Sequence, residues 1–195
     1  HKEHIPQRIL PYFADFVRFV RDLDQFLVFY NGPRCGASAP DHLHFQAGNR
    51  GVLPLIEDYN RRKDTDSELV QELAGARLIR FHKALRKVYV IESSTEEAAV
   101  SLFEAFYQTL PALDGEEPMM NLIGLFENGK WTIFVLPRLV FRPAQYSAPE
   151  PQQLMISPAA IEMAGILITP VEAHFQKINK EDIVDIFNQI SPDQP

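Results

Sequence analysis

Two histidines and a glutamine alternate with apolar residues in the segment HLHFQ, residues 42–46. Successive side chains of an extended strand point to opposite faces, so His42, His44 and Gln46 should share one face. The other face is apolar and should pack on the core; it carries Leu43, Phe45 and Ala47. A neutral imidazole on the polar face can attack phosphorus as a nucleophile or, with further ligands, bind a metal ion.

A loop of small residues, NGPRCGASAP, precedes these histidines at residues 31–40. Its small side chains, Gly36 among them, leave backbone N–H groups accessible, and such loops can hold phosphate oxygens. Asn31, Arg34 and Ser38 add side-chain donors for a phosphate. An imidazole beside a phosphate loop favours two-step transfer, in which histidine forms a phosphoramidate that a second substrate then opens.

Gln46 constrains the expected reaction further. An amide cannot give up a proton as a general acid, so the leaving group should already be stable as an anion. Sugar phosphates and nucleotide phosphates meet this condition. Transfer to phosphate or to a sugar phosphate therefore fits better than hydrolysis of a poor leaving group.

The motif HLHFQ resembles the histidine-triad motif in its transferase form, in which glutamine replaces the third histidine. Residues 5–9, IPQRI, resemble the LPQRI of GDP-L-galactose phosphorylases, and residues 157–166, SPAAIEMAGI, resemble their PAxxEisGh stretch. The loop GASAP, residues 36–40, resembles the GCSxP loop of galactose-1-phosphate uridylyltransferases. The chain thus resembles the histidine-triad superfamily, most closely its GDP-L-galactose phosphorylases, and also its diadenosine tetraphosphate phosphorylases.

The resemblance implies an enzyme, a nucleotidyltransferase of the phosphorylase type with a covalent nucleotidyl-histidine intermediate. His44 would be the nucleophile, Gln46 would hold a non-bridging phosphate oxygen, and His42 would orient the site. The residues that would contact the phosphates are Asn31, Gly36 and Ser38. The substrate would be a nucleoside-diphosphate sugar or a dinucleoside polyphosphate, and relatives often form homodimers.

We assign no metal site and expect no cofactor. The position of His42 binds a divalent metal in some uridylyltransferases, so a metal stays open as an alternative, but no carboxylate or cysteine partner can be named from the sequence. Two other functions also stay open: a non-catalytic nucleotide-binding module, and a nucleotide hydrolase.

The pattern of the chain predicts an α+β fold of the histidine-triad kind, a mostly antiparallel sheet with flanking helices. Apolar spacing predicts a helix over residues 7–23, and residues 26–31 and 42–48 should be strands. Residues 120–137 should form a hairpin around Asn128-Gly129. Further predicted elements are a capping box at Ser94 and Glu97, a strand at residues 166–169 and a final helix capped by Asn179.

The length of 195 residues fits one domain, residues 1–195, with N-terminal strands of relatives missing. The order of elements also suits two similar halves, with a motif-bearing part at residues 1–57 and a second part at residues 68–195.

Composition limits the partners. The net charge of -7 argues against broad affinity for nucleic acid or anionic membranes. The chain has one cysteine, Cys35, and contains no apolar run of about 20 residues and no signal-peptide pattern. We therefore expect a cytoplasmic protein that binds a nucleotide or nucleotide sugar.

Overall fold

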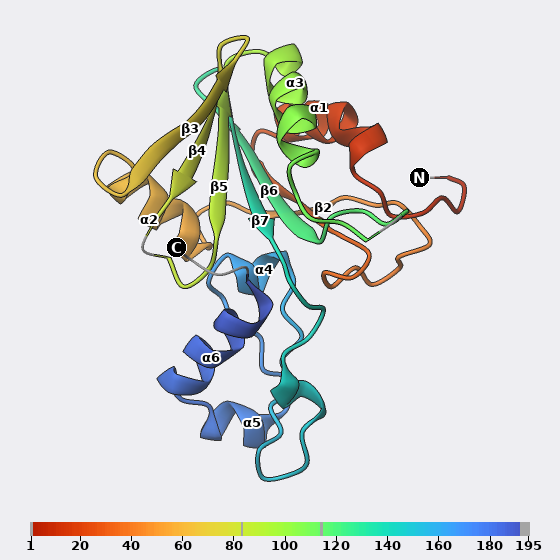
Figure 1. The fold of residues 1–195 in the computed structure, drawn as a ribbon, viewed down its shortest axis with the longest axis vertical. Helices are drawn as coiled ribbons and strands as arrows, with labels where there is room; N and C mark the ends of the chain where they lie inside the picture. Colours follow the sequence, from red (N-terminus) through yellow and green to blue (C-terminus); the bar gives the residue numbers. More distant parts are fainter. Residues whose placement is uncertain (1, 83, 114, 192–195) are drawn as a thin grey trace.

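A computed structural model describes residues 2–82, 84–113 and 115–191. Its centre is a seven-stranded sheet with the order β2-β1-β6-β7-β5-β4-β3, in which every neighbouring pair is antiparallel (Figure 1). The strands are β1 (Phe26–Asn31), β2 (Gln46–Asn49), β3 (Ser67–Leu73), β4 (Ala76–Phe81), β5 (Val88–Ser93), β6 (Met120–Glu127) and β7 (Lys130–Pro137). The predicted α+β class with an antiparallel sheet and flanking helices is confirmed.

Helices cover both faces of the sheet. They are α1 (Phe13–Asp22), α2 (Pro54–Arg62), α3 (Glu96–Tyr107), α4 (Ala160–Met163), α5 (Glu172–Lys177) and α6 (Lys180–Ile190), with 3-10 turns at Leu10–Tyr12 and Ala144–Ser147. One apolar core lies between the sheet and α1 and α3, and a second lies between the sheet and α2, α4 and α6. Figure 1 shows the C-terminal part, α4 to α6, extending beyond one end of the sheet.

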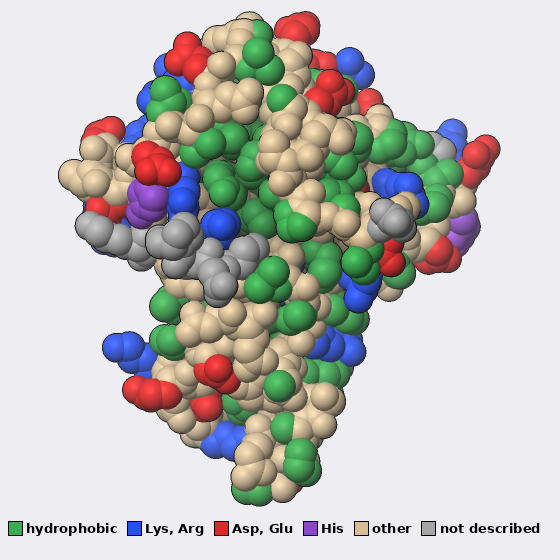
Figure 2. All heavy atoms as spheres, in the orientation of Figure 1, with side chains coloured by type: hydrophobic (Ala, Val, Ile, Leu, Met, Phe, Trp, Pro, Cys, Tyr) green, Lys and Arg blue, Asp and Glu red, His purple; other side chains and the backbone are tan. Residues whose placement is uncertain are grey.

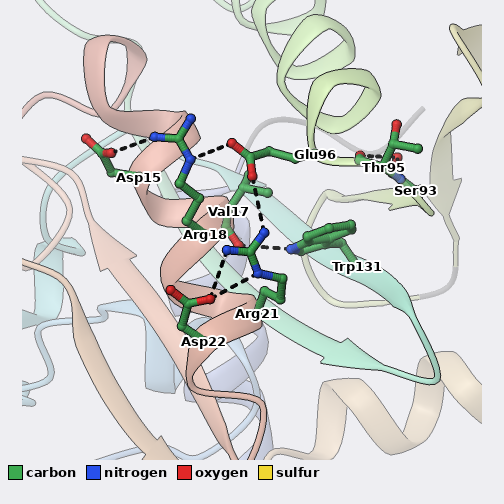
Figure 3. Close-up of polar contacts among 9 residues, drawn as sticks. All are labelled: Asp15, Val17, Arg18, Arg21, Asp22, Ser93, Thr95, Glu96 and Trp131. Carbon is green, nitrogen blue, oxygen red and sulfur yellow. Dashed lines mark hydrogen bonds and ion pairs between the residues drawn. The ribbon is translucent and has the colours of Figure 1, made fainter.

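Helices α1 and α3 are joined by a polar cluster at their solvent side (Figure 3). The Glu96 carboxylate lies 2.6 Å from Arg18 and 3.5 Å from Arg21, both on α1. The indole N–H of Trp131, on β7, donates to the Val17 carbonyl at 2.9 Å. Because Phe13 also stacks on Phe103 with 3.7 Å between ring centroids, this face of the sheet is closed by packed helices.

The local predictions at residues 120–137 and at Asn179 are confirmed. Asn128 and Gly129 have φ angles of 52° and 75°, as a two-residue turn with two left-handed positions requires. Asn179 accepts a hydrogen bond from the Asp182 amide at 3.0 Å, so it caps α6.

Three other local predictions are wrong. The cap of α3 is Thr95, whose hydroxyl accepts from the Ala98 amide, one residue after the predicted Ser94. Residues 166–169 have no strand in the structure, because they run outside the sheet after α4. The strand predicted at residues 42–48 is also too long: β2 begins only at Gln46, so both histidines lie in the segment that leads into it.

The sheet combines strands from both of the predicted parts of the chain. Strand β1 lies between β2 and β6, so residues of the motif-bearing part are hydrogen-bonded directly to β6 of the second part.

On the face drawn in Figure 2, acidic and basic side chains alternate around the margins and hydrophobic ones spread across the middle. Across the described ranges, none of the helices has the length and apolar character to cross a membrane.

Candidate functional site

The predicted nucleophile, His44, is held by a buried glutamine rather than by a neighbouring strand. Gln7 is 0% exposed, and its Oε1 accepts from the His44 amide at 2.9 Å. Its Nε2 donates to the His44 carbonyl at 3.1 Å and to the Asn31 carbonyl at 3.0 Å. One side-chain amide therefore satisfies main-chain groups of the His44 segment and of the end of β1, where the two strands separate.

The His44 ring is held in one tautomer by its own chain. Its Nδ1 lies 2.8 Å from the carbonyl oxygen of His42. A carbonyl can only accept, so Nδ1 carries a hydrogen, and in the neutral ring Nε2 then keeps its lone pair. Nε2 has no hydrogen-bond partner within the described ranges, and the residue is half-buried. The ring is thus neither packed in the apolar interior nor fully exposed.

Of the three apolar residues predicted to pack on the core, Leu43 and Phe45 do so and Ala47 does not. Leu43 is 5% exposed and Phe45 is half-buried, and both belong to the core under α1. The Phe45 ring packs edge-on against Phe16 with 5.3 Å between centroids. Ala47 is exposed, because it lies on the edge strand β2 beyond the reach of α1.

The orientation of the Gln46 amide follows from a chain of hydrogen bonds. The Asn31 Oδ1 accepts from the Ala160 amide and from Asn121 Nδ2, each at 2.8 Å. Asn31 Nδ2 therefore faces Gln46 and donates to its Oε1 at 3.1 Å. With Oε1 occupied, the Gln46 Nε2, a donor of two hydrogen bonds, is left without a hydrogen-bond partner among the described residues.

The series of hydrogen bonds that orients Gln46 ends at the buried guanidinium of Arg138, which is 3% exposed. It donates to Asn121 Oδ1 at 3.0 Å and to the carbonyl oxygens of Pro158, Val140 and Phe141 at 2.9 to 3.1 Å. A guanidinium only donates, so it fixes the Asn121 amide and, through it, Asn31 and Gln46. Burial lowers the pKa of Arg138 from its usual value, although arginine remains protonated.

The small-residue loop packs against the residues that precede α4. Gly36 has a φ of 92°, and a Cβ built on it would lie 2.5 Å from the Ala159 Cβ, so the loop requires glycine there. Glu162 accepts from the Ala159 amide at 2.8 Å and holds this turn. Ser38 is exposed at the outer side of the loop.

The structure brings together most of the predicted site residues but places Arg34 apart from them. Asn31, at the end of β1, donates to Gln46, the first residue of β2, and the His44 ring bonds to the His42 carbonyl in the segment just before β2. Arg34 instead donates to Glu116 at 3.0 Å, on the side of the loop that faces residues 111–113 and 116–119.

A third histidine lies beside the motif. The His4 ring is 4.6 Å from the His42 ring, and its Nδ1 is 3.5 Å from the Asp41 carboxylate. Over the part of the chain that the structure describes, no three or more His, Cys, Asp or Glu side chains are placed to hold a metal ion.

The sequence gives little sign of the buried residues that hold the site. Gln7 lies in the segment that resembles known phosphorylases, but nothing in its surroundings marks it as a partner of His44. Asn121 and Arg138 lie at the ends of β6 and β7, and only their placement in space joins them to Asn31.

A buried carboxyl lies near the same loop. Glu117 accepts from the Tyr30 hydroxyl at 2.6 Å and from the Ile9 amide. Burial raises the pKa of Glu117 to about 7, although these two hydrogen bonds favour its ionised form.

We expect Glu117 to make the protein less stable as the pH rises. Its folded pKa lies above the unfolded value, so the folded state binds its proton more tightly, and the free energy of unfolding falls between about pH 4.5 and 7. The loss should be roughly 2 to 3 kcal/mol, measured by urea unfolding at pH 5, 6, 7 and 8. Glu117→Gln should remove this slope and the exposed Glu116→Gln should keep it; an unchanged slope in Glu117→Gln would refute the assignment.

The fold and the site define a mixed α+β protein in which the segment leading into the edge strand β2 carries a histidine whose Nε2 has no hydrogen-bond partner among the described residues. A family described as "Domain of unknown function (DUF4922)" matches residues 1–49, which contain both Gln7 and the HLHFQ motif. Among solved structures, a DUF4931 family protein from Bacillus cereus ATCC 10987 is similar, with a TM-score of 0.47, 20% sequence identity and 76% of each chain covered. No curated protein matches the chain.

Proposed function

We propose that the protein is a nucleotidyltransferase of the phosphorylase type that works through a nucleotidyl-His44 intermediate, as the resemblance to the histidine-triad superfamily implies. The observation that carries the proposal is the hydrogen bond from His44 Nδ1 to the His42 carbonyl. It leaves the Nε2 lone pair free and supports the positive charge that the ring acquires when Nε2 bonds to phosphorus.

The reaction has two steps. Nε2 attacks the α-phosphorus of a nucleoside-diphosphate sugar or a dinucleoside polyphosphate, and the bond from that phosphorus to its bridging oxygen breaks. The sugar phosphate or nucleotide leaves as an anion, so no acid is required. An acceptor phosphate then attacks the phosphorus of the phosphoramidate, the bond from that phosphorus to Nε2 breaks, and a nucleoside diphosphate forms as the lone pair returns to Nε2.

Gln46 supports this reaction because its free Nε2 can donate to a non-bridging oxygen of the α-phosphate. Since Asn31 occupies Oε1, the amide does not need to reorient when substrate binds. The backbone amides of the loop from Gly36 to Ser38 would take the remaining phosphate oxygens.

The arrangement of the three resembling segments also supports the proposal. Residues 5–9 contribute Gln7, which holds His44, and residues 157–166 contribute the Ala160 amide, which holds Asn31. Segments that lie far apart in the sequence therefore converge on the same few residues at the start of β2.

Covalent labelling tests the proposal directly. The protein is incubated with GDP-, UDP- and ADP-hexoses and with diadenosine tetraphosphate, each carrying ³²P at the α-position. We expect a label that is stable in base, is lost in acid and maps to the peptide containing His44. A label on another residue would refute the assignment. Binding by calorimetry without label would favour a non-catalytic module, and release of nucleoside monophosphate without a phosphate acceptor would favour a hydrolase.

A further inference from the structure

Two hollows meet at Arg34, on the side of the small-residue loop where Arg34 pairs with Glu116. The first, of about 280 Å³, is lined by Pro6, Gln7, Arg8, Pro33, Arg34, Cys35, Pro40, Glu116, Glu117 and Met119. The second, of about 250 Å³, shares Arg34, Glu116, Glu117 and Met119 with it and adds Arg138. We call the two together the Arg34 groove. His42, His44 and Gln46 do not line it.

The Arg34 groove has an excess of positive charge, although the whole chain carries a net charge of -7. Its described lining includes three guanidinium groups, from Arg8, Arg34 and Arg138, and two carboxyl groups, from Glu116 and Glu117. Because the pKa of Glu117 is raised to about 7, that group carries less than a full charge at neutral pH. The local field in the groove therefore favours an anion.

Arg138 contributes buried positive charge, and none of its direct hydrogen-bond partners among the described residues is a carboxylate, although the Glu162 carboxylate lies close enough to act on it electrostatically. Its four terminal N–H groups donate to an amide oxygen and three carbonyl oxygens, all of them uncharged. Its Nε is buried and has no hydrogen-bond partner within the described residues. A buried guanidinium whose direct hydrogen-bond partners are all uncharged is stabilised further by an anion bound nearby.

Glu116 occupies the position that an incoming anion would take. Its carboxylate lies 3.0 Å from Arg34, and the two side chains are 47% and 53% exposed. Half-exposed ion pairs contribute little to stability, so Arg34 can exchange this partner at little cost. A phosphate group offers the same paired acceptors as a carboxylate, with a higher charge.

Apolar side chains complete the walls of the groove and leave space for the body of a small ligand. They come from the loop, from the segment before β6 and from the end of β7: Pro33, Pro40, Pro111, Leu113, Met119 and Leu139. The hollow next to Arg8 has a volume of about 280 Å³ and the hollow next to Arg138 about 250 Å³, and Arg34 lines both, so one phosphate group at Arg34 would occupy only part of either. The remaining space can take the body of a small phosphate monoester.

We propose that the Arg34 groove is a binding site for inorganic phosphate or a small phosphate monoester, separate from the His44 site, with Arg34 as its principal ligand and Glu116 as the group that the phosphate displaces. The groove shares Gln7 and Arg138 with the residues that hold His44 and Gln46, but phosphate binding at Arg34 does not depend on the transferase function of His44.

The two halves of the ion pair give opposite predictions. Arg34→Met should weaken binding at least tenfold, because it removes the paired donors. Glu116→Gln should strengthen binding about three- to tenfold, because it removes the competing charge and leaves Arg34 available. An ion pair with only a structural role would give no such opposite effects.

Isothermal titration calorimetry with inorganic phosphate and, in a separate arm, glucose 1-phosphate measures these changes. All variants also carry His44→Asn, so that nucleotidyl exchange and turnover contribute nothing to the measured heat of binding. The result therefore does not depend on whether the transferase proposal is correct. Arg50→Met, which removes the arginine that pairs with Glu127, is the matched control and should bind as the parent does. Stronger binding of glucose 1-phosphate than of phosphate would identify a monoester site, and the reverse a phosphate site. Equal affinities for phosphate in Arg34→Met and Glu116→Gln would overturn the proposal.

Discussion

Replacing His44 with asparagine should lower the rate of nucleotidyl exchange by about 10⁴-fold or more and remove the covalent label. Asparagine is polar and of similar size, but its amide nitrogen has no lone pair that can attack phosphorus. The main-chain bonds of residue 44 to Gln7 do not involve the imidazole, so they should persist in the variant. The loss should therefore appear in kcat, with substrate affinity little changed.

His42→Ala is the matched control for this prediction. His42 contacts the His44 ring through the main-chain carbonyl of His42, which alanine retains. We expect a loss of about tenfold, because the His42 ring also borders His4 and helps to shape the approach to the site. Exchange of labelled phosphate into nucleoside diphosphate measures both rates. If His44→Asn kept more than about one hundredth of the parent rate, His44 would not be the nucleophile.

Strands and turns with strong local patterns could be predicted from the sequence. Strand β1 has the bounds expected from FLVFYN, and the hairpin of β6 and β7 follows from Asn128-Gly129. These elements depend on short-range preferences, namely branched and aromatic residues in strands and left-handed positions in turns. The antiparallel class of the sheet follows from such hairpins.

The start of β2 could not be predicted, because alternation describes side chains and not the partner of the backbone. Residues 42–45 alternate as a strand does, yet their main chain meets the Gln7 side chain and the Ile5 carbonyl instead of a strand. A glutamine 37 positions earlier gives no local signal of this contact. The strand predicted at residues 166–169 failed for the same reason, since an apolar run does not show whether a neighbouring strand is available.

The motif indicated the candidate nucleophile and the glutamine beside it, but not the residues that orient them. Asn121 and Arg138 belong to β6 and to the end of β7, and they reach Asn31 only because β6 is the neighbour of β1 in the sheet. For Arg34, by contrast, the sequence suggested a placement that the structure does not contain. Its place in the small-residue loop predicts a contact with the same phosphates as His44, but the loop turns its side chain towards Glu116.

Replacing Gln7 with leucine should lower both the stability and the rate of exchange. Leucine has a similar volume but leaves three main-chain groups without partners: the His44 amide and the carbonyls of His44 and Asn31. Each unsatisfied buried group costs about 1 to 3 kcal/mol, so the free energy of unfolding should fall by roughly 3 to 5 kcal/mol. Urea unfolding measures this loss, and Gln108→Leu, at an exposed position after α3, should change it little.

The rate of exchange shows whether Gln7 positions the nucleophile or only supports the fold. If the main chain of His44 is free to shift, Nε2 no longer lies in line with the α-phosphorus, and a displacement of about 1 Å can cost about 100-fold in rate. We therefore expect kcat per folded molecule to fall about 100-fold in Gln7→Leu, with KM nearly constant, at a temperature where the variant is fully folded. A normal kcat in the folded variant would show that Gln7 stabilises the chain without positioning His44, and the geometric argument for the nucleophile would then rest on the His42 carbonyl alone.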